Sequence, residues 1–292
     1  MKNLMPPDES IFPIVDLALA EDTGHGDVTS EALIPPALVG KATIQAKAEG
    51  VLAGIEIARK ILLRVDESLE VTVLIRDGSR ITSGDIMATV YGKVASILKA
   101  ERVMLNFLQR LSGVATQASE YVARTQGLKA RIVDTRKTTP GLRMMEKYAV
   151  LMGGAQNHRF HLGDAVLIKD THLAAMRAQG MDLKGIVDKT RKEAPAGICV
   201  EVEVATVEDA LEAAETGVDI IMLDNMSPEE MTRAVRQIPA NIRTEASGGI
   251  NLDNVREVAE TGVDIISIGA LTHSVQALDI SLKIDPDSIR LP

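Results

Sequence analysis

Aromatic side chains and positive charge are both scarce in this sequence. Aromatic residues make up 2% of the chain, and 32 lysines and arginines compare with 41 aspartates and glutamates. Proteins that bind nucleic acids generally use basic surfaces and aromatic rings on which bases stack. We therefore expect no nucleic-acid partner.

Cysteine and long apolar runs are the other absences. The single cysteine, Cys199, excludes an internal disulfide and fits a reducing compartment, so we expect a cytoplasmic protein. No apolar run reaches the roughly 18 residues of a membrane-spanning helix, so we expect no membrane partner. The first residues, MKNLMPPDES, lack the basic and apolar regions of a signal peptide, and none is expected.

The first third of the chain has a mixed pattern. Residues 13–21 have the spacing of a short amphipathic helix, with Pro13 in its first turn. Residues 41–91 contain short strand-like pieces divided by Asp-Gly and Ser-Gly turns, with one helix near residues 55–64. These patterns predict a compact, β-rich domain.

The rest of the chain alternates between helical and strand patterns. Residues 94–124 predict a long helix that Gly113 interrupts. The sequence AETGVDII occurs twice, at Ala214–Ile221 and Ala259–Ile266, each time as a helix end, a glycine cap and a strand. Six apolar runs end in polar residues: ARIVDTRK, DAVLIKD, ICVEVEV, DIIMLDN, NIRTEASGG and DIISIGA. This alternation predicts a parallel sheet, most simply a barrel.

Barrels of this kind build their ligand site at the carboxyl ends of the strands. The glycine-rich turns SGGI and IGAL follow the last two strands, where small residues let backbone N–H groups approach a phosphate. The residues at or just past strand ends are Arg136, Lys137, Lys169, Glu203, Asp224, Ser247, Gly248, Gly249 and Gly269.

Positive charge is densest in DTRKTTPGLRMMEK, which begins at Asp134. Arg136 and Lys137 come at a strand end, whereas Arg143 and Lys147 follow on a helix, where solvated surface and function are equally good interpretations. Close cations repel by roughly 4 kcal/mol per pair at intermediate dielectric. An anionic ligand is therefore expected to compensate them.

Carboxylates recur in the predicted strands. Glu201 and Glu203 alternate with valines, so both point to one face, and two carboxylates inside a barrel indicate function or a buried salt bridge. Glu203 is favoured for the site because it is nearer the carboxyl end, although which of the two faces the ligand stays open. Glu203 and Asp224 are suited to hold Mg²⁺, directly or through water, or to bind sugar hydroxyls.

The histidines give a weaker pattern. His158 and His161 have a spacing found in metal sites, but no third ligand is close in sequence, so we expect no zinc site. His172 is expected to cap or orient a loop. Cys199 is expected to be a small core residue and not a nucleophile.

A series of motifs resembles the quinolinate phosphoribosyltransferase family, also named nicotinate-nucleotide pyrophosphorylase (carboxylating). The motifs are DTRKTTPGLR, EKYAV, NHR, AVLIKD, EVEV, MLDN, EASGGI and ISIGALTHS, preceded by AEDTGHGDVTS and the pair Glu101-Arg102. The resemblance implies an α/β chain with an N-terminal α/β sandwich domain (1–112 and 275–292) and a C-terminal open-faced α/β barrel (113–274) that carries the active site. The segment LDISLKI would return to the first domain.

The implied reaction transfers phosphoribosyl from phosphoribosyl pyrophosphate to quinolinate with decarboxylation. Its products are nicotinate mononucleotide, CO₂ and pyrophosphate, in NAD biosynthesis, with Mg²⁺ as cofactor. The resemblance also implies a homodimer or higher oligomer in which Arg102 reaches the neighbouring subunit's site.

The family motifs map onto substrate-binding, catalytic and metal-binding positions. Implied substrate-binding residues are Arg102, Thr135, Arg136, Lys137, His158, Arg159, Lys169, Glu203, Asp224, Ser247, Gly248, Gly249, Gly269, Ala270 and His273. Of these, Lys137, Lys169, Glu203 and Asp224 are the implied catalytic residues, and Glu203 and Asp224 the implied metal ligands.

The sequence departs from the family's motifs at two positions. Thr171 stands where the family often has Asn, and Ala155 where a third Gly is common, which leaves the fine loop geometry open.

Three alternative functions remain. A fold-sharing paralogue of molybdate-uptake systems is expected to lack part of the TRK, NHR and IKD set. A barrel lyase would use Lys169 as a Schiff base. A non-catalytic anion-binding protein would gain nothing from carboxylates that face its ligand.

Overall fold

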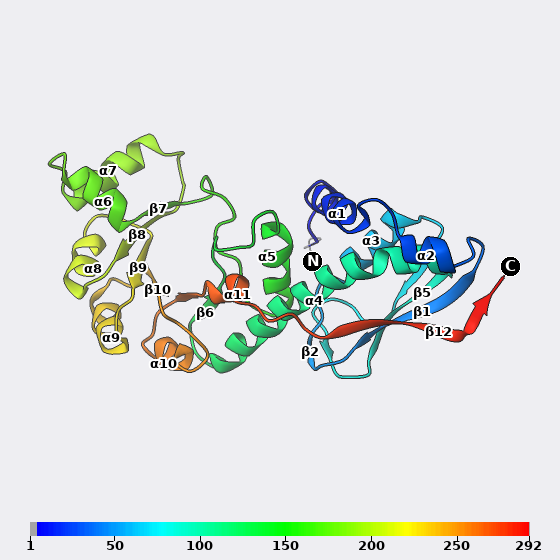
Figure 1. The fold of residues 1–292 in the computed structure, drawn as a ribbon. Helices are drawn as coiled ribbons and strands as arrows, with labels where there is room; N and C mark the ends of the chain where they lie inside the picture. The colour runs from blue at the N-terminus through cyan, green and yellow to red at the C-terminus, as the bar shows by residue number, and fades with distance from the viewer. Residues whose placement is uncertain (1–4, 292) are drawn as a thin grey trace. The chain divides into compact units, whose positions relative to one another are not determined.

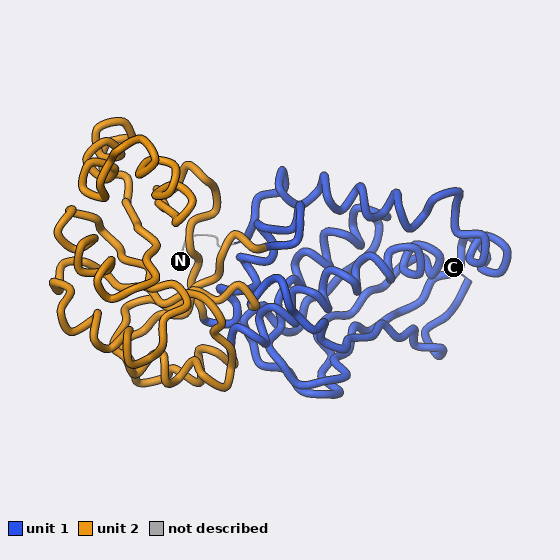
Figure 2. The backbone as a smooth tube through the Cα atoms, turned by 60° about the vertical axis from the view of Figure 1, so that its left-hand side comes forward, with its two compact units in different colours: residues 1–119, 138–154, 271–292 blue, residues 120–137, 155–270 orange. Residues whose placement is uncertain are grey.

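The computed structural model describes residues 5–291, and the chain divides into two compact units (Figure 2). Unit 1 consists of residues 1–119, 138–154 and 271–292, and unit 2 of residues 120–137 and 155–270. Both units contain helices and strands, in agreement with the predicted α/β class. The domain boundaries expected at residues 113 and 274 stay a prediction, because compactness does not test independent folding.

Unit 1 is built on an antiparallel sheet of four strands in the order β12-β1-β5-β3 (Figure 1). The last strand of the chain pairs with β1 along its length, which confirms the expected return of LDISLKI. The elements are α1 (Asp8–Thr23), α2 (Val28–Leu33), β1 (Val39–Ala46), β2 (Gly50–Val51), α3 (Ile55–Val65), β3 (Glu70–Val73), β4 (Arg80–Ile81), β5 (Ile86–Lys93), α4 (Val94–Arg124), α5 (Arg143–Met152) and β12 (Ile280–Arg290).

Helix α1 begins earlier than the sequence pattern predicts. It starts at Asp8, so Pro13 lies inside the helix and not in its first turn. Proline lacks the N–H that would bond the carbonyl four residues back. Asp8 and Glu9 in the first turn interact favourably with the helix dipole and extend the helix beyond the predicted start.

The sequence pattern predicted that Gly113 interrupts helix α4, and this prediction was wrong. The helix runs unbroken from Val94 to Arg124. A Cβ atom at Gly113 would lie 2.2 Å from the carbonyl oxygen of Gln276. The glycine is therefore explained by the close approach of another backbone segment.

Unit 2 contains a parallel sheet of six strands in the order β6-β11-β10-β9-β8-β7. These strands confirm all six predicted runs, and β6 and β7 form the open edges of the sheet. The strands are β6 (Arg131–Val133), β7 (Val166–Ile168), β8 (Val200–Val204), β9 (Ile220–Asp224), β10 (Arg243–Ser247) and β11 (Ile265–Ser267). The helices are α6 (Asp170–Arg177), α7 (Leu183–Glu193), α8 (Val207–Ala214), α9 (Pro228–Gln237), α10 (Val255–Glu260) and α11 (Ala270–His273), the last extending into unit 1.

The repeated sequence has the same role in both copies. Asp219 in the first copy accepts a hydrogen bond from the backbone N–H of Val200 at 2.7 Å, and Asp264 in the second accepts one from Thr244 at 2.9 Å. Each aspartate thus ties the start of its own strand to the start of the neighbouring strand. The repeat therefore sets the strand register at the amino ends of the sheet.

No helix among residues 5–291 is both long enough and apolar enough to cross a membrane.

Candidate active site

The carboxyl ends of the parallel strands in unit 2 enclose a pocket of about 610 Å³. This volume is in the range of small-molecule sites. Predicted site residues that line it are Thr135, Arg136, Lys137, His158, Arg159, Lys169, Glu203, Asp224, Ser247, Gly248 and Gly249. Leu167, Met222, Asn225, Glu245 and Ser267 also line it and were not predicted. The strand-end rule therefore located the pocket.

The loop after β6 is held by the buried carboxylate of Asp134. This carboxylate accepts hydrogen bonds from the Asn157 side chain at 2.7 Å and from the His158 backbone at 2.8 Å. Thr135 Oγ1 accepts a hydrogen bond from the backbone N–H of Lys137 at 3.0 Å. Asp134 thus brings the TRK and NHR motifs to the same side of the pocket.

The guanidinium of Arg159 lies in an electrostatically unfavourable place. Burial lowers its pKa, and the nearby positive charge of Arg136 lowers it further. Its Nη1 donates to the carbonyl of Ala165 at 2.9 Å, which fixes the side chain beside the pocket. A bound anion would relieve this repulsion, as the sequence analysis expected.

The turn after Lys137 is fixed within unit 1. Glu146 on α5 is fully buried and forms an ion pair with Arg110 at 2.9 Å. Its carboxylate also accepts a hydrogen bond from the backbone N–H of Thr139 at 3.0 Å. Nε of Arg143 donates a hydrogen bond to the Thr138 hydroxyl at 3.1 Å. Lys147 is fully buried, so its interpretation as solvated surface was wrong.

Lys169 directly follows β7 and forms an ion pair with Glu203 of β8, with Nζ 2.9 Å from Oε2. The backbone N–H of Lys169 donates to Nδ1 of His172 at 2.9 Å. The predicted capping role of His172 is therefore confirmed. Cys199 precedes β8 and is only half-buried, so it is not the core residue that was predicted. Burial raises the pKa of its thiol, which fits the prediction that it is not a nucleophile.

Asp224 is oriented by a strained turn. Asn225 has a φ of 54°, a left-handed conformation that Asn tolerates better than most residues, and it donates to Asp224 at 2.7 Å. The backbone N–H of Asn225 donates a hydrogen bond to the carbonyl oxygen of Ser247 at 2.9 Å. Gly248 also has a positive φ, and a Cβ there would lie 2.2 Å from the Asn225 side chain. The SGG and LDN turns thus fit against each other and fix Asp224.

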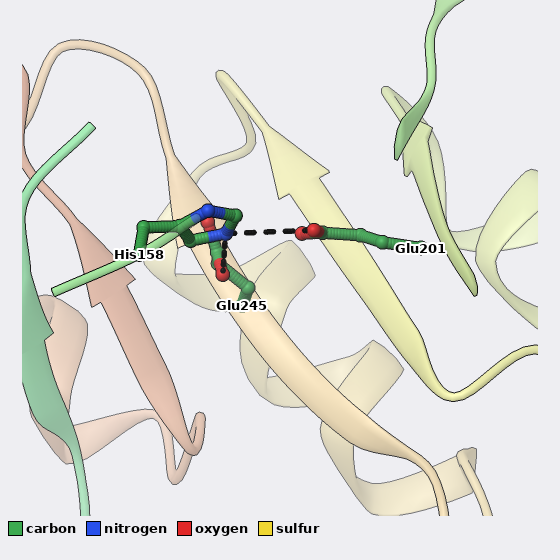
Figure 3. A group of neighbouring side chains, drawn as sticks. All are labelled: His158, Glu201 and Glu245. Carbon is green, nitrogen blue, oxygen red and sulfur yellow. Dashed lines mark ion pairs between the residues drawn. The ribbon is translucent and has the colours of Figure 1, made fainter. Parts of the chain in front are cut away.

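His158 lies between two buried carboxylates, Glu201 of β8 and Glu245 of β10 (Figure 3). Its Nε2 is 3.5 Å from Glu201 and 3.3 Å from Glu245. Glu201 is thus in a buried ion pair, one of the two interpretations that the sequence analysis left open. In the sequence, His158 and His161 have a spacing found in metal sites, but in the structure His158 lies with these two glutamates.

Two opposing effects set the pKa of His158. Burial would lower the pKa of His158, but hydrogen bonds and charge from Glu201 and Glu245 outweigh it and raise it to about 10. The backbone N–H of Arg159 donates a hydrogen bond to Nδ1 of the ring at 2.9 Å. Burial also raises the pKa of Glu201, so the cluster as a whole, and not the ring alone, holds the added proton.

Two places in unit 2 offer metal ligands. Glu203 and Asp224 both line the pocket and present the hard oxygen ligands that Mg²⁺ prefers. Among the described residues, His158, Glu201 and Glu245 form the one group of three whose ligand atoms all lie within 4.8 Å of one another. Glu203 is paired with Lys169 and His158 with its two glutamates, so both groups already have partners, and Mg²⁺ at Glu203 and Asp224 stays a prediction.

The remaining predicted residues do not line this pocket. Gly269 and Ala270 follow β11, and His273 bonds Ser274 at 2.7 Å. Arg102 is an exposed residue of α4 in unit 1. The phosphate-binding roles and the reach of Arg102 into a neighbouring subunit stay predictions.

The pocket residues that sequence reasoning missed carried recognisable signals. Asn225 directly follows Asp224 at a strand end, where the strand-end rule already applied. Leu167 and Met222 are two residues before Lys169 and Asp224, so the period of a strand places them on the same face. Glu245 is a carboxylate in a buried strand, the feature that singled out Glu201.

The chain is similar to known proteins over most of its length. The family model of the quinolinate phosphoribosyl transferase N-terminal domain matches residues 27–112, and that of the C-terminal domain matches residues 114–283. The probable nicotinate-nucleotide pyrophosphorylase [carboxylating] of Bacillus subtilis is 44% identical over 264 residues, covering 90% of each chain.

Two further relatives extend this likeness. The mitochondrial quinolinate phosphoribosyltransferase [decarboxylating] 2 of Nicotiana glauca is 43% identical over 297 residues, covering 96% of this chain and 84% of the relative. The crystal structure of NadC from Streptococcus pyogenes superposes with a TM-score of 0.91 and 40% identity, covering 96% of this chain and 97% of that one. The chain therefore belongs to the quinolinate phosphoribosyltransferase family.

Proposed function

We propose that this protein transfers the phosphoribosyl group of phosphoribosyl pyrophosphate to quinolinate and releases CO₂, forming nicotinate mononucleotide for NAD biosynthesis. The observation that carries the proposal is the composition of the pocket. Arg136, Lys137 and Arg159 supply positive charge, and Leu167 and Met222 supply an apolar surface. This combination suits an aromatic ring that bears carboxylates, together with a phosphorylated sugar.

The two anionic substrates have distinct places in this proposal. Arg136 and Arg159, with His158 and with Arg102 of the partner subunit, bind the two carboxylates of quinolinate in a homodimer. Lys137 and Lys169 lie between the substrates, and Ser247–Gly249 with Gly269, Ala270 and His273 hold the 5-phosphate. The cationic pocket then positions two anions that repel each other in solution.

The chemistry follows from this arrangement. The ring nitrogen attacks C1 of the ribose as pyrophosphate leaves, and Glu203 and Asp224 stabilise the positive charge that develops on the sugar. Mg²⁺, held by the same two carboxylates, would supply neutralisation of the leaving pyrophosphate. The alkylated nitrogen is then a cationic electron sink, so the adjacent carboxylate leaves as CO₂.

A Schiff-base lyase is a poorer interpretation of the same pocket. Such a lyase needs an amine that is available to a carbonyl substrate, whereas Nζ of Lys169 is in an ion pair with Glu203 at 2.9 Å. A molybdate-system paralogue is also disfavoured, because the TRK, NHR and IKD motifs are intact and mostly line the pocket.

A product assay tests the proposal. Purified protein is incubated with quinolinate, phosphoribosyl pyrophosphate and Mg²⁺, and nicotinate mononucleotide and CO₂ are measured. We expect both products in equal amounts. Borohydride trapping of a carbonyl compound on Lys169, with no product from quinolinate, would establish the lyase instead.

A further inference from the structure

The chain passes from unit 2 into unit 1 directly after two segments of the proposed site. One passage follows Lys137 and the other follows Ala270. Lys137 and the preceding Arg136 line the pocket and belong to the quinolinate side of the proposed site. Ala270 and the preceding Gly269 belong to its proposed phosphate side. A residue that holds the chain just after both passages therefore bears on both substrates.

One guanidinium, that of Arg110 on helix α4, holds both segments. Its Nη2 donates hydrogen bonds to the carbonyl oxygen of Thr272 at 2.6 Å and to the Thr139 hydroxyl at 3.1 Å. Thr139 is two residues past Lys137, and Thr272 is two residues past Ala270. Arg110 and both threonines belong to unit 1, so these bonds fix two segments of one compact unit to each other.

The buried carboxylate of Glu146 fixes the direction of the Arg110 side chain. Its Oε1 accepts hydrogen bonds from Nε of Arg110 at 3.1 Å and from Nη2 at 2.9 Å. The Thr139 hydroxyl donates to the same oxygen at 2.8 Å, while the Thr139 backbone N–H occupies Oε2. Both carboxylate oxygens therefore have partners. Because a guanidinium is planar and its N–H groups point in fixed directions, the arrangement allows one geometry.

Close packing against helix α4 keeps both segments in place. A Cβ atom at Gly153, at the end of helix α5, would lie 2.3 Å from the carbonyl oxygen of Ala115. At Gly113 the corresponding distance to the Gln276 carbonyl is 2.2 Å. The chain after each passage thus lies directly against the backbone of α4, which a side chain at either glycine would prevent. Arg110 is therefore attached to a rigid support.

We propose that Arg110 is a positioning residue that aligns the quinolinate side and the phosphate side of the active site with each other. The proposal rests on the proposed function. Arg110 is not one of the described residues that line the pocket, so it acts through the segments after Lys137 and Ala270. Its bonds to Thr139 and Thr272 set the spacing of these segments. That spacing in turn determines how the ring nitrogen of quinolinate meets C1 of the ribose.

Arg110→Lys tests this alignment because it keeps a positive charge beside Glu146. A single ammonium group cannot reproduce the planar fork that reaches Glu146, Thr139 and Thr272 together. We expect kcat to fall by about 100-fold, the cost of a misplacement of about 1 Å that originates away from the reacting atoms. The KM for each substrate should stay within about threefold, since each side of the site remains intact. Unchanged kcat with a raised KM for either substrate would overturn the proposal.

Gln109→Ala is the matched control. Gln109 precedes Arg110 on α4, and its side chain also donates to a backbone carbonyl of the returning chain, that of Ile280 at 2.7 Å. This bond lies well beyond the segment that follows Ala270, so its loss should lower the melting temperature and leave kcat unchanged. If Gln109→Ala and Arg110→Lys lower kcat equally, the effect comes from general loss of packing and the positioning role is wrong.

A double variant, Arg110→Met with Glu146→Leu, covers the case in which Arg110→Lys does not fold. Replacing a buried ion pair by apolar side chains of similar volume is often neutral for stability. The double variant should keep a cooperative melting transition and lose about 100-fold in kcat. Wild-type kcat in the folded double variant would overturn the proposal. Failure of the wild type to make any product would instead overturn the proposed function.

Discussion

At the scale of single residues, backbone conformation decides how the pocket is shaped. Gly248 combines a φ of 90° with a Cβ position only 2.2 Å from the Asn225 side chain. Gly248→Ala should therefore displace Asn225 and the Asp224 carboxylate that it bonds. We expect the free energy of unfolding to fall by about 1–3 kcal/mol and turnover to fall at least tenfold. Urea denaturation and initial rates would measure both.

Gly249 gives the matched comparison. It also has a positive φ, at 64°, but no heavy atom lies within 4 Å of a Cβ there. In Gly249→Ala the free energy of unfolding should fall by only about 1 kcal/mol, which is the cost of holding an alanine in the left-handed conformation. Equal losses of stability for both substitutions would show that the contact with Asn225 has no effect.

The site residues divide into those that the sequence could locate and those that it could not. Arg136, Lys169 and Asp224 follow from strand ends alone. The pairing of Glu201 with Glu245 could not be predicted, because it joins alternate strands through a histidine from a distant loop. The burial of Lys147 was also missed, since a charged helical residue is ordinarily solvated.

At the scale of elements, helix α4 shows packing that outweighs helix propensity. Alanine is favoured over glycine inside a helix by about 1 kcal/mol. At Gly113, however, a methyl group would overlap the Gln276 carbonyl, a backbone atom that cannot move alone. Gly113→Ala should therefore lower the melting temperature, whereas Asn106→Ala at an exposed position of the same helix should raise it slightly. A higher melting temperature for Gly113→Ala would contradict the close packing.

The elements themselves were largely predictable. Six apolar runs and a repeated octapeptide were enough for the parallel sheet, because strand period and glycine caps are local signals. The start of α1 was not, since Pro13 gave a local signal that the acidic first turn and burial of Ile11 overrode. The position of β12 beside β1 came from the family resemblance and not from local pattern.

At the scale of the whole molecule, the buried His158 cluster makes stability depend on pH. The pKa of His158 is raised to about 10 from an ordinary value of 6.5, so folding takes up protons. The stabilisation is complete below about pH 6.5 and is lost as the pH rises towards 10. Glu201, Glu245 and the backbone N–H of Arg159 are among the groups that contact the ring.

Urea denaturation at pH 6.5 and pH 9.5 measures this dependence. The free energy of unfolding should fall by roughly 1–3 kcal/mol over that interval. Removing both carboxylates in a Glu201→Gln, Glu245→Gln double variant should flatten the dependence. A wild-type stability that rises with pH would contradict the assigned protonation of the cluster.

The proposed dimer makes a distinct prediction. Arg136→Ala should lose about 2–5 kcal/mol of transition-state stabilisation, as when a buried charge loses its partner, and Arg102→Ala should also be nearly inactive. If Arg102 acts in the neighbouring subunit, mixed dimers of the two variants contain one intact site. Unfolding and refolding the mixture should then restore about a quarter of wild-type activity. No recovery in refolded mixed dimers would place Arg102 and Arg136 in the same subunit's site.

The substrate itself is the most direct test of the whole assignment. Initial rates of nicotinate mononucleotide formation would be measured with quinolinate and with nicotinate, each with phosphoribosyl pyrophosphate and Mg²⁺, while CO₂ is followed. If the pocket binds both carboxylates of quinolinate, quinolinate should react at least about 100-fold more efficiently, with one CO₂ released per product, because nicotinate has no second carboxylate to balance the positive charge of the pocket. Equal or faster reaction of nicotinate would contradict the central claim.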